Sequence, residues 1–199
     1  MTRYHRSARL IYRAIEPEDE DFILEQEQDP TLMQQGSWHL PAPQNRKSGR
    51  ETIKFMTEEC VLSAIICLKP ADESISAAEL TPVGYVHLDR TPTNLPQHRS
   101  GDIGLAITPA HQGKGYGSEA IAWILDFAFN EANFHRVGCP VFSWNTRAWE
   151  LYRRLGFTED GRYRELLWMK GRWCDFVLMS MLDREWEALK NQKLAIPER

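Results

Sequence analysis

The sequence predicts a single α/β domain, in which strand-like and helical segments alternate along 199 residues. Residues 9–15 alternate apolar and polar side chains, as a half-buried strand does, and residues 61–68 form an apolar run of strand length. A glycine-rich turn at 112–118 precedes apolar residues at helical spacing. No internal repeat and no change of composition marks a second domain. We therefore expect one core over residues 8–183, followed by a helix or tail over 184–199.

Local signals predict the other elements in chain order. Pro17 opens an acidic segment that suits a helix start, because proline and carboxylates complement the exposed N–H groups of a first turn, and Pro30 ends that helix. Residues 31–50 are rich in glycine and proline and predict a long loop with one helical turn. The apolar runs at 61–68 and 83–90 are expected to pair as a hairpin. Further strands are expected at 102–107, 136–143 and 173–181, and a short helix at 146–155.

The composition argues against several classes of protein. A net charge of −4 lacks the basic surplus that is typical of a nucleic-acid-binding domain. The N-terminal segment lacks the apolar stretch of a secretion signal, and no apolar run approaches the roughly 18 residues that cross a bilayer. The four cysteines form no C-x-x-C pair and no cluster with histidine at zinc spacing, so we expect reduced thiols and no metal. These observations predict a cytoplasmic protein without nucleic-acid or membrane partners.

The glycine-rich turn reads QGKGYGS from Gln112 to Ser118. It lies between an apolar strand and a helix start, where free backbone N–H groups and the helix dipole attract an anion. Glycine lets a phosphate approach the backbone and tolerates a positive φ. The P-loop pattern is absent because Gly115 follows Lys114, and the dinucleotide fingerprint fails because Ser118 stands where a glycine is needed. The sequence therefore predicts an anion site with the pattern Q-x-x-G-x-G.

A second motif, NTRAWELYRRLGF, spans residues 145–157. Asn145 is a good N-cap for the helix that follows, and Gly156 stands where a left-handed C-terminal cap belongs. Ala148 and Tyr152 fall on one face of that helix. Taken alone, this motif predicts only a capped helix. A tyrosine at the position of Tyr152 is more often a core aromatic than a catalytic acid.

Together, in this order and at this spacing, the two motifs resemble those of the GNAT superfamily of N-acetyltransferases, Q/R-x-x-G-x-G/A followed by N-x-x-A-x-x-x-Y-x-x-x-G-F. The likeness extends from Arg9 to Leu182 and is weakest at 31–60 and 69–81. The stretches RLIYRAIEPEDEDF and GFTEDGRYRELLWMKGRWCDFVLMSML are similar to the branch that holds ribosomal-protein N-terminal acetyltransferases and spermidine acetyltransferases, and PAHQGKGYG is especially similar to the spermidine enzymes. The resemblance implies a mixed, mostly antiparallel central sheet with two splayed parallel strands, 102–107 and 137–142, and helices on both faces.

The resemblance also implies direct transfer of acetyl from acetyl-CoA to an amine in a ternary complex, without a metal. Tyr152 would be the general acid that protonates the departing CoA thiolate. Asp102 would accept the amine proton, directly or through water, although an ordinary polar residue at a strand end is equally expected there. His87 on the neighbouring strand is a second candidate because imidazole is a fitting base, although a surface histidine on a strand is the commoner case. The acetyl-CoA-binding residues that the resemblance implies, for the pantetheine arm or the pyrophosphate, are Ile107, Gln112, Gly113, Lys114, Gly115, Gly117, Ser118, Asn145 and Ala148.

The sequence leaves the acceptor open. The acidic residues between Glu16 and Glu27 would suit a polyamine, but an acidic helix face usually means only solvation. The alternatives are a protein N-terminal amine, a lysine side chain, an aminoglycoside or another small amine. A module that binds acyl-CoA without turnover is a further alternative, against which the presence of Tyr152 and Asn145 argues. The resemblance also allows a homo-oligomer.

Overall fold

The computed structural model describes residues 5–38, 42–70, 80–90 and 95–194, which form two compact units. The first unit comprises Met1–Asp89 and Gly104–Ile124, and the second comprises Arg90–Ile103 and Leu125–Arg199. Strand β5 (Ser100–Ile107) and helix α4 (Tyr116–Asp126) each contribute residues to both units. The two units are described in turn.

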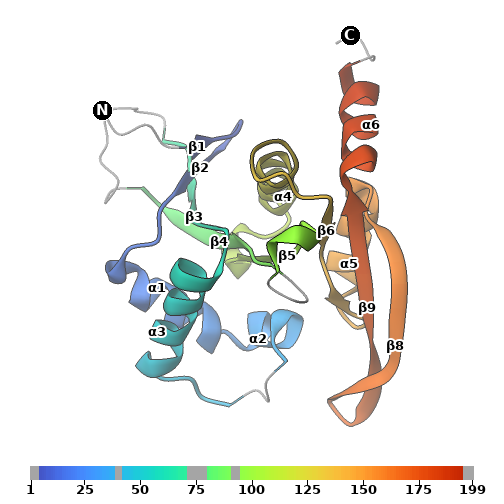
Figure 1. Cartoon of the computed structure of the whole chain (residues 1–199). Helices are drawn as coiled ribbons and strands as arrows, with labels where there is room; N and C mark the ends of the chain where they lie inside the picture. Colours follow the sequence, from blue (N-terminus) through green and yellow to red (C-terminus); the bar gives the residue numbers. More distant parts are fainter. Residues whose placement is uncertain (1–4, 39–41, 71–79, 91–94, 195–199) are drawn as a thin grey trace. The chain divides into compact units, whose positions relative to one another are not determined.

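The first unit is built on an antiparallel sheet. Its strands are β1 (His5–Arg6), β2 (Leu10–Arg13), β3 (Leu62–Leu68) and β4 (Pro82–Leu88), in that order, with the second half of β5 beside β4 (Figure 1). The strands predicted at 9–15, 61–68 and 83–90 are thereby confirmed, and so is the hairpin of the last two. Strand β1 was not predicted, since two exposed residues carry no apolar pattern.

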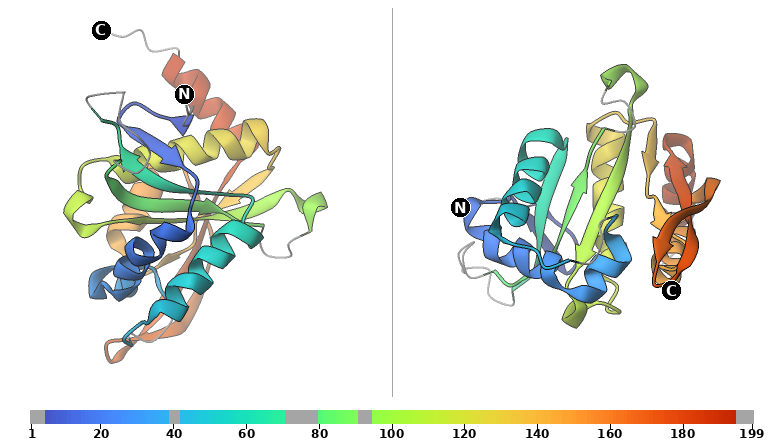
Figure 2. Two further views of the ribbon diagram at one scale, coloured as in Figure 1. Left: turned by 90° about the vertical axis from the view of Figure 1, so that its left-hand side faces the viewer. Right: turned by 90° about the horizontal axis from the view of Figure 1, so that it is seen from below.

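Helices cover both faces of this sheet. Helix α1 (Glu20–Gln28) and helix α3 (Arg46–Lys54) lie side by side along one face, and the start of α4 lies against the other (Figure 2). The alternation of β2 explains this arrangement, because Ile11 joins the core under α1 while Tyr12 stacks on Trp123 of α4. The core on the α1 side contains Ile11, Ile23, Met56, Ile65, Cys67 and Leu80.

The long loop predicted at 31–50 is wrong, because this region holds two helices. Pro30 ends α1 as predicted but also begins α2 (Pro30–Gly36), since proline needs no N–H partner at a first helical position. Asp29 caps α2 by accepting hydrogen bonds from the N–H groups of Thr31 and Leu32. Asn45 caps α3 in the same way through the N–H of Lys47. Gly36 therefore ends one helix and Gly49 lies buried inside the other, so neither glycine marks a continuous loop.

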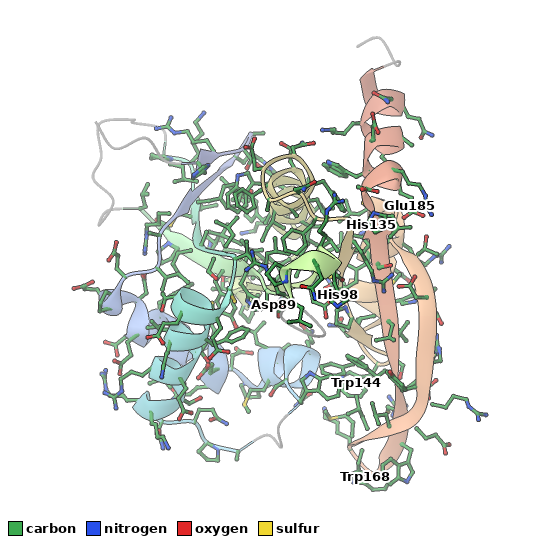
Figure 3. The ribbon with its side chains drawn as sticks, in the orientation of Figure 1. Asp89, His98, His135, Trp144, Trp168 and Glu185 are labelled. Carbon is green, nitrogen blue, oxygen red and sulfur yellow. The ribbon has the colours of Figure 1, made fainter. Side chains whose placement is uncertain are left out.

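The second unit is organised around β9 (Arg172–Leu182). This strand pairs antiparallel with β6 (Arg136–Gly138), β7 (Val141–Phe142) and β8 (Thr158–Met169). The first residues of β5 pair parallel with β6, with Ser100 opposite Arg136 and Asp102 opposite Gly138. Helix α6 (Asp183–Leu194) follows β9, and Glu185 and His135 lie where the helix begins (Figure 3). There the Nδ1 atom of His135 lies 3.1 Å from a carboxylate oxygen of Asp183.

Pro140 divides the strand predicted at 136–143 into β6 and β7. Proline has no N–H to donate to the ladder. The pairing register with β9 nevertheless continues across the break, since Gly138 lies opposite Ser180 and Val141 opposite Val177. The N–H of Cys139 donates to the carbonyl of Met179 over 2.8 Å. The break is therefore not a change of register, and because the N–H of Cys139 bonds β9, the nitrogen of Pro140 faces away from that strand.

Strand β8 was missed in the sequence. Most of its residues are exposed, so the apolar alternation that marks a half-buried strand is absent. It is held by its antiparallel partner β9, and the hairpin ends near the edge-to-face pair of Trp168 and Trp173, whose rings lie 5.2 Å apart (Figure 3). Of the helices within the described ranges, none has the length and apolar character needed to cross a membrane.

Candidate active site

The glycine-rich turn follows β5 in the first unit and leads into α4. Gly113 and Gly115 have φ angles of 79° and 85°, in the left-handed region that other residues rarely adopt. The backbone from Gly113 to Gly115 is exposed, and the first N–H groups of α4 lie directly behind it. Gln112 fixes the start of the turn, because its Nε2 donates to the carbonyl of Ile107 over 3.0 Å. The turn therefore has the backbone geometry of an anion site, and it is tied to the end of β5.

His87 occupies β4 in the same unit. Its imidazole covers Gly104 of β5, so closely that a Cβ atom on this glycine would overlap the ring. The ring of Phe55 meets it edge to face at 5.4 Å. Burial lowers the pKa of His87 to about 4, and its Nδ1 atom is buried without a hydrogen-bond partner among the described residues. His87 is therefore neutral at pH 7 and keeps a nitrogen that can accept a proton.

Asp102 lies in the second unit, at the last position where β5 pairs with β6. Its carboxylate covers Gly138, the residue opposite it, and occupies the space that a side chain there would fill. The sequence offers no sign of this relationship, because the two residues are 36 positions apart. The absence of a side chain on Gly138 therefore determines where the carboxylate lies.

The second motif forms α5 (Thr146–Leu155), as predicted. The Oδ1 atom of Asn145 accepts the N–H of Ala148 over 3.1 Å, and Gly156 closes the helix with a φ of 98°. This local capping positions the face of the helix that carries Tyr152.

Tyr152 is hydrogen-bonded to Cys139, at the break between β6 and β7. Burial, reinforced by the nearby thiol, raises the pKa of Tyr152 well above 10. Burial also raises the pKa of Cys139 to about 12, against the hydrogen bond from Tyr152 and with a contribution from the Asp102 carboxylate. At neutral pH, Tyr152 therefore keeps the proton that a general acid must donate. Cys139 stays a thiol and is a poor nucleophile.

The predicted residues fall into two groups. His87, Ile107 and residues 112–118 belong to the first unit, whereas Asp102, Asn145, Ala148 and Tyr152 belong to the second. Within the first group, Gln112 contacts Ile107. Within the second, Asn145 contacts Ala148. Sequence reasoning missed Arg9, whose guanidinium contacts the glycine-rich turn, and Cys139 as the partner of Tyr152.

A family model described as the acetyltransferase (GNAT) domain matches residues 9–158. The chain belongs to this GNAT acetyltransferase family. The matched region includes the glycine-rich turn, α5 and parts of both units. Family membership makes the chain an acetyl-CoA-dependent N-acetyltransferase and confirms the resemblance drawn from the two motifs.

Relatives of this GNAT enzyme include named acetyltransferases. The SPbeta prophage-derived uncharacterized N-acetyltransferase YokL of Bacillus subtilis (strain 168) is 28% identical over 92% of this chain and 96% of its own length. The spermidine N(1)-acetyltransferase of Vibrio cholerae is 31% identical over 56% of this chain and 58% of its own length. The putative ribosomal N-acetyltransferase YdaF of Bacillus subtilis (strain 168) is 35% identical over 49% of this chain and 54% of its own length.

A solved structure supports the same family. The crystal structure of spermidine N-acetyltransferase from Vibrio cholerae in complex with CoA and spermine has a TM-score of 0.72 and 26% sequence identity, and the likeness covers 89% of this chain and 98% of that one. The mixed α/β fold of the GNAT enzyme, with a mostly antiparallel sheet and the parallel pair β5–β6, is thereby confirmed.

Proposed function

We propose that this GNAT enzyme acetylates a primary amine of a small acceptor in the polyamine class. The likeness to a spermidine N-acetyltransferase solved with CoA and spermine, over 89% of the chain, carries this proposal. A protein N-terminal amine is the second candidate, which the 35% identity to a putative ribosomal N-acetyltransferase over 49% of the chain supports. An acceptor lysine side chain would use the same chemistry.

The glycine-rich turn is proposed to hold the pyrophosphate of acetyl-CoA. The exposed backbone, the two left-handed glycines and the helix start behind them support this role, because the first N–H groups of a helix have no partner within the helix and can bind an anion. The residues proposed for this task are Gln112, Gly113, Lys114, Gly115, Gly117 and Ser118. Ile107, Asn145 and Ala148 are proposed for the pantetheine arm.

Tyr152 is proposed as the general acid. The amine nitrogen attacks the thioester carbonyl, and the carbon–sulfur bond breaks as the tetrahedral intermediate collapses. The departing thiolate takes the phenolic proton of Tyr152, and the amine gives up a proton to a base. A raised pKa supports this role, because the phenol is fully protonated before the reaction. Solvent then returns a proton to Tyr152.

Asp102 and His87 remain the two proposed bases. Asp102 offers a carboxylate whose position Gly138 secures. His87 offers a neutral nitrogen without a partner among the described residues, but a pKa of about 4 makes it a weak base. An ordinary carboxylate is no stronger a base, so basicity does not separate the two candidates. We favour Asp102, because its carboxylate is close enough to Cys139, the partner of Tyr152, to raise the pKa of that thiol.

The acidic segment gives a polyamine acceptor little support. Asp19 pairs with Arg13 at 2.6 Å and is nearly buried. Glu20 and Asp21 both lie within ion-pair distance of Arg46, at 3.2 Å and 2.8 Å. These three carboxylates are engaged with arginines of the first unit, so the polyamine proposal rests on the relatives and not on this charge.

The test is release of free CoA from acetyl-CoA, followed with a thiol reagent, across a panel of acceptors. The panel contains spermidine, spermine, lysine, an aminoglycoside and short peptides with free N-termini, and Tyr152→Phe is the control for background hydrolysis. Fastest turnover with a polyamine supports the proposal, and fastest turnover with a peptide replaces it with the second candidate. Silence across the panel, with CoA still raising the melting temperature, would indicate a specific protein acceptor or a module that binds CoA without turnover.

A further inference from the structure

The β1–β2 hairpin contacts the glycine-rich turn, more than a hundred positions away in the sequence. The hairpin is short, with His5 opposite Tyr12 and the N–H of Ser7 donating to the carbonyl of Leu10. Tyr12 anchors it to α4, because its ring stacks on that of Trp123 with centroids 3.8 Å apart and planes within 3°. The hairpin thus places residue 9 beside the turn.

Arg9 bridges the turn and the first turn of α4. Its Nη1 donates to the carbonyl of Lys114 over 2.8 Å, and its Nε donates to a carboxylate oxygen of Glu119 over 2.8 Å. Its guanidinium also lies over the ring of Tyr116, with Cζ 4.9 Å from the centroid. The Nη2 atom covers one side of Gly115, 3.1 Å from the position that a Cβ atom would take. One side chain thus contacts the middle of the turn, its second left-handed glycine and the helix behind it.

Glu119 holds Arg9 in this position. One carboxylate oxygen accepts the backbone N–H of Arg9 over 2.6 Å and the hydroxyl of Ser7 over 2.7 Å, while the other accepts Nε of Arg9. Burial would raise the pKa of Glu119, but these hydrogen bonds outweigh it and lower that pKa below its usual range. The side chain of Glu119 is only 13% exposed, so its charge depends on Arg9 and Ser7 for compensation.

A turn with three glycines has more accessible conformations than one built from other residues, and it must adopt one of them to bind a phosphate group. Each residue that is ordered on binding costs affinity, which a preformed site avoids. The Arg9 contact with the Lys114 carbonyl turns that oxygen toward the hairpin. The contact fixes the turn through a carbonyl oxygen and not through an N–H group that an anion would bind.

We propose that Arg9 is a positioning residue that preorganises the glycine-rich turn for the pyrophosphate of acetyl-CoA. The inference rests on the proposed role of the turn. The role of Arg9 needs the forked shape of the guanidinium and not only its positive charge, because one nitrogen binds the Lys114 carbonyl and another binds the Glu119 carboxylate. The effect is therefore confined to ligands that carry a pyrophosphate.

The test compares Arg9→Ala and Arg9→Lys with the wild-type chain. We expect each variant to raise the Kd for CoA, measured by calorimetry, and the KM for acetyl-CoA by about tenfold, at nearly unchanged kcat. Turnover of S-acetylpantetheine, which has the thioester and the pantetheine arm but no pyrophosphate, should stay within twofold of the wild-type value. Arg50→Ala is the matched control, since Arg50 is also an exposed arginine near a glutamate of the first unit. It should leave both substrates unaffected.

Three outcomes would overturn the inference. Arg9→Lys with wild-type affinity for CoA would show that charge alone suffices. If the variants lose turnover with S-acetylpantetheine as strongly as with acetyl-CoA, Arg9 supports the fold as a whole and not the turn. Unchanged CoA affinity in both variants would show that the turn is ordered without Arg9. Failure of the wild-type chain to bind CoA at all would instead refute the proposed function of the turn, on which the inference depends.

Discussion

The carboxylate of Asp102 lies over Gly138, in the space that a side chain on Gly138 would occupy. The two residues face each other at the last parallel pair between β5 and β6. Asp102 also contributes to the raised pKa of Cys139, the partner of Tyr152. A proposed base and a proposed acid are thus linked through one small region of the second unit.

Gly138→Ala should therefore displace the Asp102 carboxylate. If Asp102 is the base, we expect kcat to fall by about a hundredfold, as for loss of a general base, with little change in CoA affinity. Asp102→Asn should have a similar effect. Gly161→Ala is the control, because a Cβ atom there meets no neighbour within 4 Å. Wild-type turnover in Gly138→Ala would remove Asp102 from the reaction.

Gly104→Ala tests His87 by the same reasoning. The new methyl group would overlap the imidazole ring, so His87 must move from its position over β5. Since we favour Asp102 as the base, we expect kcat to fall less than tenfold in Gly104→Ala and in His87→Gln. A fall of a hundredfold in both variants, with Gly138→Ala near wild type, would exchange the roles of the two candidates.

Tyr152→Phe should lower kcat by about a hundredfold while the Kd for CoA stays within about twofold, because the lost hydroxyl acts only on the leaving group. The raised pKa of Tyr152 predicts that its acid function persists up to at least pH 10. The measurement is kcat against pH for the wild-type chain and the variant. Equal turnover of the two proteins would exclude Tyr152 as the acid.

Gly115→Val should weaken CoA binding by more than tenfold. The φ of 85° is strained for a β-branched residue, and the new side chain would press on Arg9. Gly171→Val is a matched control, since Gly171 has a φ of 81° and open space around it. Calorimetry with CoA should show the loss in the first variant alone. Intact affinity in Gly115→Val would place the pyrophosphate elsewhere.

His87 should make the free energy of unfolding depend on pH. Its pKa is about 4 in the folded chain and 6.5 without burial, so between these values the unfolded chain binds more protons. The stability that neutral His87 provides is fully present above pH 6.5 and is lost as the pH falls toward 4. Between pH 7 and pH 5 the free energy of unfolding of the wild-type chain should fall by about 2 kcal/mol more than that of His87→Gln. Urea unfolding at the two pH values measures this difference, and parallel losses would contradict the buried, neutral state of His87.

Local signals made part of this structure predictable. Helix α5 has the predicted bounds because its caps, Asn145 and Gly156, act within one turn of the helix ends. Strand β8 was missed because it is stabilised by pairing with β9 and not by an apolar face of its own. Helices α2 and α3 were missed because proline and glycine predict a loop, whereas Pro30 begins α2, Gly36 ends it and Gly49 lies inside α3.

The relationships within the site depend on tertiary contacts and could not be predicted. Arg9 and Glu119 are 110 positions apart, and nothing near Arg9 in the sequence indicates a phosphate site. Asp102 and Gly138 come together only because β5 and β6 pair in one register. The motifs predict which residues carry the chemistry, but the residues that position them come from other parts of the chain.

Strand β9 lies entirely outside the region that matches the family model, which ends at Thr158. The N–H of Cys139 donates to the carbonyl of Met179, and the N–H of Ser143 donates to the carbonyl of Asp175. Substitutions in this strand can therefore shift the partner of Tyr152 by fractions of an ångström without altering any motif residue. Among relatives that share both motifs, sequence differences at 172–182 should therefore accompany differences in catalytic rate. A comparison of the two motifs alone would not reveal them.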